Sequence, residues 1–183
     1  MKKSNHFCAD LQRYIAETAI GPSSLRNQGA NGVIRAARDY LADLDLTVFR
    51  GKNERSFLRT LDTKTEELRQ ALPWGARNWG AARKALNIFL RDICYNRFLC
   101  ERLGLSDAQE EWMEIPLDAT VANALISTDE RGELPSWPGL IRLTPEVSAD
   151  FQKFAKEAAA KQNITRIHLD MRLWTKERAK KRT

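Results

Sequence analysis

The sequence predicts an all-α fold. Apolar residues recur at helical spacing along most of the chain, as Phe7, Leu11 and Ile15 do at intervals of four. Only 9 of the 183 residues are glycine and 6 are proline, which is too few for a loop-rich protein. Because 43% of the residues are hydrophobic, the chain can bury an ordinary core. We therefore expect residues 1–183 to form a single all-helical domain.

Proline, glycine and capping residues mark most of the expected helix ends. Pro73 stops one helix, and Gly104 closes a longer one. Asp118 and Thr144 are good N-caps. Residues 105–117 and 127–143 are expected to be loops, with 47–49 and 140–143 as candidates for short strands. The expected helices cover about residues 5–20, 33–41, 54–72, 82–103, 119–125 and 145–162, and a last one begins near 165 and ends in a basic tail, 176–183.

The charge of the chain favours a polyanionic partner. The formal net charge is +6, and nucleic acid is the commonest partner of such a chain. The tail 176–183 and the cluster Arg26, Arg35 and Arg38 would add attraction to phosphates. Each of these two groups is equally typical of a solvated helix face or chain end.

Cysteine and histidine usage gives no metal or cofactor site. The three cysteines, Cys8, Cys94 and Cys100, form no disulfide framework, and on one helix the last two would point about 120° apart. His168 and Asp170 are a minor candidate pair that a satisfied surface or core contact explains equally well. The chain has neither the apolar core of a signal peptide nor an apolar run of membrane-spanning length. We therefore expect an intracellular protein with no membrane segment.

The richest motif lies at the turn between two expected helices. The helix over 54–72, a connection with two glycines and the helix from 82 form a helix-hairpin-helix over about 54–103. Such a turn exposes backbone N–H groups beside a helix N-terminus, where they can bind a DNA phosphate. An ordinary helix-turn-helix corner with a solvated Arg83 and Lys84 fits the same pattern.

The residues of this turn also resemble a known family. The run Trp-Gly-Ala-Ala-Arg-Lys-Ala-Leu-Asn over 79–87 resembles the hairpin of helix-hairpin-helix DNA glycosylases, where a Pro-Gly-x-Gly-Arg-Lys-Thr-Ala-Asn-like run carries a catalytic lysine. Ala82 replaces the usual second glycine, and Trp79 stands where proline is common. The resemblance implies a helical glycosylase-like fold, a catalytic Lys84, and DNA contacts from the hairpin residues Trp79, Gly80, Ala81, Ala82, Arg83 and Asn87.

A second segment, over about 114–125, resembles the same family. Its Ile-Pro-Leu-Asp-Ala-Thr-Val is similar to the family's Val-Pro-Val-Asp-Thr-x-Val, which carries the catalytic aspartate. Asp118 is the matching residue. An aspartate directly before a helix is also an ordinary N-cap, and the two roles are compatible.

The resemblance implies removal of a base from deoxyribose. Breaking that bond creates a cationic sugar, which the carboxylate of Asp118 would stabilise, and the same carboxylate could activate a nucleophile. Lys84 would attack the sugar carbon C1′ and form a Schiff base, which adds lyase activity. Alternatively, Lys84 contacts a phosphate and water is the nucleophile. The sequence leaves both roles open.

A glycosylase of this kind flips its target base into a pocket with aromatic walls. Trp112 and Trp137 are the tryptophans that we expect there. Oxidised purines, alkylated purines and a hypermodified phage cytosine all remain candidate substrates, so a role in repair or in defence against phages stays open. No cofactor is expected, because the four closely spaced cysteines of iron–sulfur members are missing.

The expected partner is double-stranded DNA, bound by a monomer in the cytoplasm at the nucleoid. Two other functions fit the sequence. One is a non-catalytic helical module that uses the hairpin only to bind phosphates, and the other is a helical protein-interaction domain.

Overall fold

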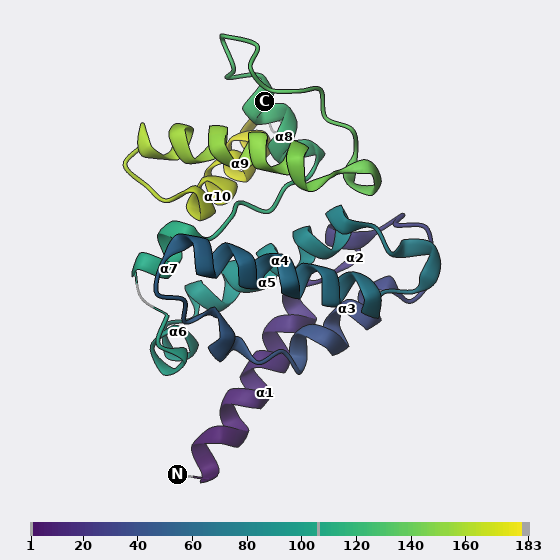
Figure 1. The fold of residues 1–183 in the computed structure, drawn as a ribbon, viewed down its shortest axis with the longest axis vertical. Coiled ribbons are helices and arrows are strands. Elements are labelled where there is room, and N and C mark those ends of the chain that lie inside the picture. Colours follow the sequence, from purple (N-terminus) through teal and green to yellow (C-terminus); the bar gives the residue numbers. More distant parts are fainter. Residues whose placement is uncertain (1, 106, 181–183) are drawn as a thin grey trace.

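The computed structural model describes residues 2–105 and 107–180, and these ranges contain helices and connecting segments but no β-strand (Figure 1). The prediction of an all-α fold is confirmed. The α-helices are α1 (Lys2–Ala19), α2 (Pro22–Leu25), α3 (Val33–Ala42), α4 (Glu54–Ala71), α5 (Trp79–Tyr95), α6 (Arg97–Leu103), α7 (Asp107–Trp112), α8 (Ala119–Ile126), α9 (Pro145–Ala160) and α10 (Arg166–Lys180). Three short 3₁₀ turns are η1 (Leu46–Phe49), η2 (Trp74–Ala76) and η3 (Leu140–Arg142).

The helices pack around two apolar clusters. Helices α1 to α7 form the larger lobe in the lower part of Figure 1, and Phe49, Phe57 and Phe89 are fully buried in its core. Helices α8, α9 and α10 form the smaller lobe above it, around Phe151. The extended segment 113–118 runs from one lobe to the other (Figure 1). The junction between the lobes is therefore built around this segment.

Most predicted helix ends are confirmed by their caps. The side chain of Thr144 accepts a hydrogen bond from Val147 N at 3.3 Å, and that of Asp118 accepts one from Val121 N at 3.0 Å. Gly104 follows α6 in the left-handed conformation, with φ of 63°, which costs glycine little.

Four local predictions are wrong. The helix expected over 82–103 is two helices, because Asn96 ends α5 and its side chain accepts a hydrogen bond from Leu99 N at the start of α6. Cys94 and Cys100 therefore lie on different helices. Helix α7 forms within the expected loop 105–117, and the candidate strands at 47–49 and 140–143 are 3₁₀ turns. The expected tail is helical up to Lys180, and residues 181–183 lie outside the described residues.

The helix that carries Lys84 begins earlier than predicted. It starts at Trp79 instead of residue 82, so Gly80 is a helical residue and not part of the turn. Asn78 is the N-cap of this helix, and the Asn78 side chain accepts a hydrogen bond from Ala81 N at 2.9 Å. Helix α5 also packs closely against η3 at Gly80, where a Cβ atom would lie 2.2 Å from the Leu140 carbonyl oxygen. The N-terminus of α5 is thereby covered by the segment before α9.

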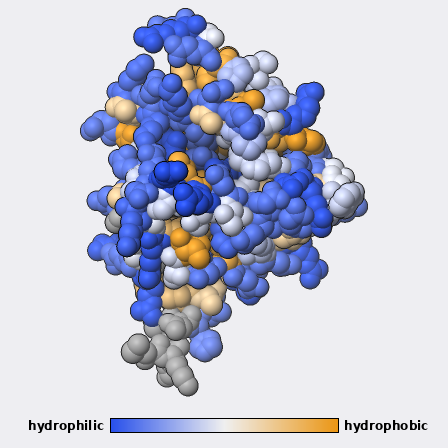
Figure 2. All heavy atoms as spheres, in the orientation of Figure 1, coloured by the Kyte–Doolittle hydropathy of each residue, from blue (hydrophilic) through white to orange (hydrophobic). Residues whose placement is uncertain are grey.

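Hydrophilic residues cover most of the face seen in Figure 2, and apolar residues appear there as separate small patches. Within the described ranges, no helix combines the length and the apolar character that crossing a membrane requires.

Candidate active site

Lys84 and Asp118, which two separate motifs single out, form an ion pair. Lys84 lies on the second turn of α5, and Asp118 is the N-cap of α8. The distance between Lys84 Nζ and Asp118 Oδ2 is 3.1 Å. The lysine side chain is only 7% exposed, whereas the aspartate side chain is 36% exposed. The lysine is therefore held beneath a carboxylate that solvent can reach.

The pair lines a cleft of about 470 Å³ between the two lobes. A volume of this size is typical of small-ligand sites. Side chains of α1, α2, α5, α8 and α10 and of the segment before α8 form its walls. Its charged and aromatic lining residues are Arg26, Lys84, Arg91, Asp92, Asp118, Asp170 and Trp174.

Arg91 and Asp170 form a second ion pair on the wall of the same cleft. Arg91 follows Lys84 by two helical turns and so projects from the same face of α5. Its Nε atom also lies 2.8 Å from Asp92 Oδ1. Burial raises the pKa of the Asp170 carboxyl, and the neighbouring Arg91 guanidinium opposes that rise. The seven-residue spacing of Lys84 and Arg91 is a sequence signal that could have identified this second pair.

The aromatic wall of the cleft is Trp174, which lies one helical turn after Asp170 on α10. The two tryptophans expected in the base pocket lie elsewhere. Trp112 packs against Phe57 in the larger lobe, with ring centroids 6.1 Å apart, and Trp137 packs edge-to-face on Phe151 in the smaller lobe. Neither ring lines the cleft. The apolar cores of the two lobes hold these rings.

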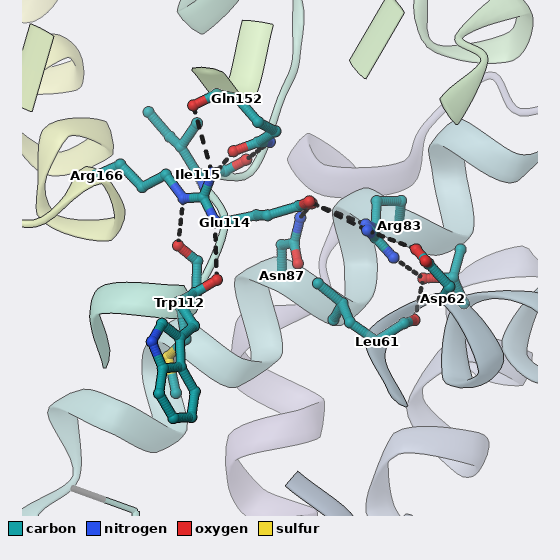
Figure 3. Close-up of polar contacts among 11 residues, drawn as sticks. Leu61, Asp62, Arg83, Asn87, Trp112, Glu114, Ile115, Gln152 and Arg166 are labelled. Atoms are coloured by element: carbon teal, nitrogen blue, oxygen red, sulfur yellow. Dashed lines mark hydrogen bonds and ion pairs between the residues drawn. The ribbon is translucent and has the colours of Figure 1, made fainter. Parts of the chain in front are cut away.

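Arg83 and Asn87 lie in a buried network next to the cleft. Arg83 donates to both carboxylate oxygens of Glu114, at 2.8 and 3.1 Å, and to the Thr65 hydroxyl at 2.9 Å (Figure 3). It also pairs with Asp62 at 2.9 Å. Asn87 donates to Glu114 Oε2 at 3.2 Å. Both side chains are therefore turned away from solvent and serve the junction between α4, α5 and the segment 113–118.

The same network fixes the segment that leads to Asp118. Arg166 donates to the carbonyl oxygens of Trp112 and Met113 at 2.8 and 2.7 Å (Figure 3). The side-chain amide of Gln152 makes two hydrogen bonds to the backbone of Ile115, at 2.8 and 3.0 Å. Because the segment is held from both sides, the position of the Asp118 carboxylate is defined by the junction and not by a free loop.

Glu114 is ionised within this network. Burial alone would raise the pKa of its carboxyl, but the charge and hydrogen bonds of Arg83, followed by the charge of Arg166, hold that pKa below the ordinary value. A buried carboxylate between two guanidinium groups satisfies the rule that buried charges are paired.

The remaining hairpin residues are buried, Gly80 by its contact with η3 and Ala81 and Ala82 in the core of the larger lobe. Gly80, Ala81 and Ala82 have little or no exposure, and the side chain of Asn78 caps the Ala81 N–H at 2.9 Å. Trp79 is half-buried, with the Arg83 guanidinium 5.1 Å from the centre of its ring. In this arrangement the hairpin supports Lys84 but does not present the exposed amides that a phosphate would need.

His168 points away from the cleft. Its Nε2 lies 2.8 Å from Glu110 Oε1, and its Nδ1 lies 3.1 Å from the Tyr95 hydroxyl. Among residues 2–105 and 107–180, no group of three or more His, Cys, Asp or Glu side chains is placed to hold a metal ion.

We compared the chain with protein-family models, with curated proteins and with solved structures, and found no match. Its function has to be inferred from the cleft and the residues that line it.

Proposed function

We propose that this protein is a DNA glycosylase that flips a modified or damaged base into the cleft and cleaves its bond to deoxyribose. One observation carries the proposal: the lysine and the aspartate, each singled out by its own motif, meet at 3.1 Å in a cleft large enough for a small ligand. The resemblance of both motifs to those of helix-hairpin-helix DNA glycosylases supports the proposal. The proposed partner is double-stranded DNA, and the proposed place of action is the nucleoid.

Asp118 would stabilise the sugar as the base leaves. Its carboxylate is fixed by the Val121 N–H and by Lys84, and it is still partly exposed to the cleft. A carboxylate held in this way needs little reorganisation when positive charge develops on the sugar ring. This property suits the residue for the step in which the bond to the base breaks.

Lys84 would form the covalent intermediate. Transfer of one proton from its ammonium to the neighbouring Asp118 carboxylate gives a neutral amine, the form that attacks carbon. The amine then bonds to C1′ while the bond from C1′ to the base nitrogen breaks. The base leaves with the electron pair and takes up the proton that Asp118 received, so the Asp118 carboxylate is restored while positive charge is present on the sugar. Loss of a proton from the new amine and opening of the sugar ring give the Schiff base. If Lys84 stays charged, water attacks in its place.

The walls of the cleft offer contacts for a flipped base. Trp174 could stack on the ring, while the Arg91–Asp170 pair presents donors and acceptors at its edge. This combination of one aromatic face and a few polar groups is typical of sites that orient a flat heterocycle.

The first test is base excision. Purified protein is incubated with duplexes that carry oxidised purines, alkylated purines or hypermodified cytosine, and abasic sites are revealed by alkaline cleavage. We expect Asp118→Asn to lower base release at least about 100-fold, because the charge that stabilises the sugar is lost. A borohydride trap in parallel should yield a protein–DNA adduct that Lys84→Gln removes.

The controls separate chemistry from binding. Lys153→Gln, which changes an exposed lysine on α9 outside the cleft, should leave both excision and trapping intact. Base release that survives in Lys84→Gln would assign the attack to water. Steeply salt-dependent DNA binding without base release from any of these duplexes would contradict the glycosylase and favour a non-catalytic DNA-binding module.

A further inference from the structure

An exposed tryptophan stands outside the cleft, at the turn between α4 and α5. Trp74 in η2 is 84% exposed, whereas Trp174 in the cleft is 48% exposed. The guanidinium carbon of Arg77 lies 5.3 Å from the centre of its ring. Trp74 is the most exposed of the large apolar side chains among the described residues.

The backbone that carries Trp74 is tightly held. A Cβ atom on Gly29 would lie 2.2 Å from the Gly75 carbonyl oxygen, so the loop before α3 packs directly on η2. Gly29 has φ of 97°, a conformation that glycine adopts without strain. Arg77 Nε also donates to the Leu72 carbonyl oxygen at 3.1 Å. The backbone at Trp74 is therefore held in place, so little backbone entropy is lost when the side chain binds a ligand.

The loop 26–32 links this tryptophan to the cleft, because Arg26 lines the cleft and Gly29 packs on Gly75 beside Trp74. Arg26 lines the cleft and also a neighbouring depression of about 600 Å³, in which Asn27, Asn31 and Arg35 are exposed. Glu17 and Asp39 line the same depression, and Asp39 Oδ2 lies 3.8 Å from Arg35 Nε in an exposed ion pair. Arg26, Asn27 and Asn31 lie in the loop that packs on η2, and Arg35 follows on the first turn of α3. We call Arg26, Asn27, Asn31, Arg35 and Trp74 the loop–tryptophan strip.

We propose that the loop–tryptophan strip binds the DNA strand beside the cleft, with Trp74 stacked on a base that has left the duplex stack. The proposal rests on the proposed function, because it takes DNA as the ligand of the cleft. Arginine and asparagine side chains contact phosphates, and an exposed aromatic ring stacks on any base. This combination of groups fits a nucleic acid strand better than an apolar protein surface, which would bury a wider hydrophobic patch.

The test is a binding experiment that needs no catalysis. The affinity for a duplex with a tetrahydrofuran abasic analogue is compared with the affinity for the same duplex fully paired. Base–aromatic stacking is lost in Trp74→Ala, so its affinity for the abasic duplex should fall about 5- to 150-fold, and more than for the paired duplex. Trp74→Phe should recover most of the loss, because phenylalanine also stacks.

Two further variants complete the experiment. Phe98→Ala removes another partly exposed ring, on α6 beyond the end of α5 that is distant from η2, and should bind like the wild type. Arg26→Gln should reduce the slope of log affinity against log salt by about one, because one phosphate contact is lost.

The possible outcomes distinguish this proposal from the glycosylase itself. Equal affinities of wild type and Trp74→Ala would overturn the strip even if Asp118→Asn abolished base release. Conversely, a loss of affinity in Trp74→Ala without base release from any substrate would support the strip and contradict the enzyme. Concentration-dependent self-association that Trp74→Ala removes, with DNA affinity unchanged, would assign the ring to a contact between two copies and overturn the strip.

Discussion

Arg83 and Lys84 are neighbours on α5, and each forms an ion pair, but the two pairs differ in their exposure to solvent. Arg83 and Glu114 are 7% and 9% exposed, and hydrogen bonds from Asn87 and to Thr65 surround them. Lys84 is equally buried, but its partner Asp118 opens to the cleft. Consecutive helix residues point about 100° apart, so one side chain enters the junction between the lobes and the next enters the cleft.

This difference shows that two neighbouring charged residues of one motif can have different roles. A buried pair with all of its hydrogen bonds made is costly to break, because the partner that remains is left charged inside the protein. A pair at the edge of a cleft can lose or transfer its charge while solvent compensates. We therefore expect Arg83 and Glu114 to stabilise the fold, and we propose that Lys84 and Asp118 carry out the chemistry.

The largest effect on stability is expected from Glu114→Ala. Removal of this carboxylate leaves Arg83 buried with only the exposed Asp62 as an anionic partner, and it loosens the segment before Asp118. We expect the free energy of unfolding to fall by about 3–5 kcal/mol. Urea unfolding followed by far-UV circular dichroism would measure it.

Asp118→Asn is the matched substitution at the other pair. Asparagine is as good an N-cap as aspartate, and its side-chain oxygen can still accept a hydrogen bond from Lys84. The free energy of unfolding should therefore fall by clearly less than in Glu114→Ala. A loss as large as that of Glu114→Ala would contradict the division of roles, because the cleft pair would then also be structural.

A second prediction concerns pH, because two buried carboxyls shift in opposite directions. The pKa of Glu114 is held below its ordinary value of 4.5, so the unfolded state binds more protons and Glu114 stabilises the fold above that pH. This stabilisation is lost as the pH falls through the folded-state pKa. The pKa of Asp170 is raised above its ordinary value of 3.8, mainly by burial, so the folded state binds more protons there. Stability from Asp170 is present at low pH and is lost as the pH rises through the folded-state pKa.

The measurement is unfolding free energy against pH for the wild type, Glu114→Gln and Asp170→Asn. The deficit of Glu114→Gln relative to the wild type should shrink on acidification below about pH 4.5. Relative to the wild type, Asp170→Asn should instead gain stability as the pH rises from about 3.8. If the stability of both variants relative to the wild type changed in the same direction as the pH rose, the opposite pKa shifts of Glu114 and Asp170 would be contradicted.

The sequence predicted the parts of the molecule that depend on local signals. Gly104, Thr144 and Asp118 marked helix ends because capping needs only the residue and its near neighbours. Lys84 and Asp118 were found because each lies in a short motif with a recognisable pattern. Asn96 carries a similar signal, since asparagine is a favoured N-cap, but the apolar stripe that continues past it hid the break.

What the sequence did not predict depends on distant partners. The roles of Arg83 and Asn87 are set by Glu114, about thirty residues further along the chain, and Gly80 is buried by Leu140. No local pattern distinguishes an arginine that binds phosphate from one that will meet a buried carboxylate. Trp174 lines the cleft for the same kind of reason, since only the packing of α10 brings it there.

The smallest effect is expected where an ion pair joins the two lobes at the surface. Lys156 on α9 pairs with Glu54 at the start of α4 at 2.8 Å, and the two side chains are 49% and 41% exposed. Solvent screens such a pair and both side chains lose entropy, so a double-mutant cycle with Lys156→Ala and Glu54→Ala should give a coupling of about 0.2–1 kcal/mol that weakens in high salt. The cycle tests whether burial determines how much an ion pair contributes to stability, or whether any ion pair between the lobes contributes as much. A salt-independent coupling as large as the effect of Glu114→Ala would show that surface contacts hold the lobes together as strongly as the buried junction does. That result would contradict the dominant role of the Arg83–Glu114 pair in stability.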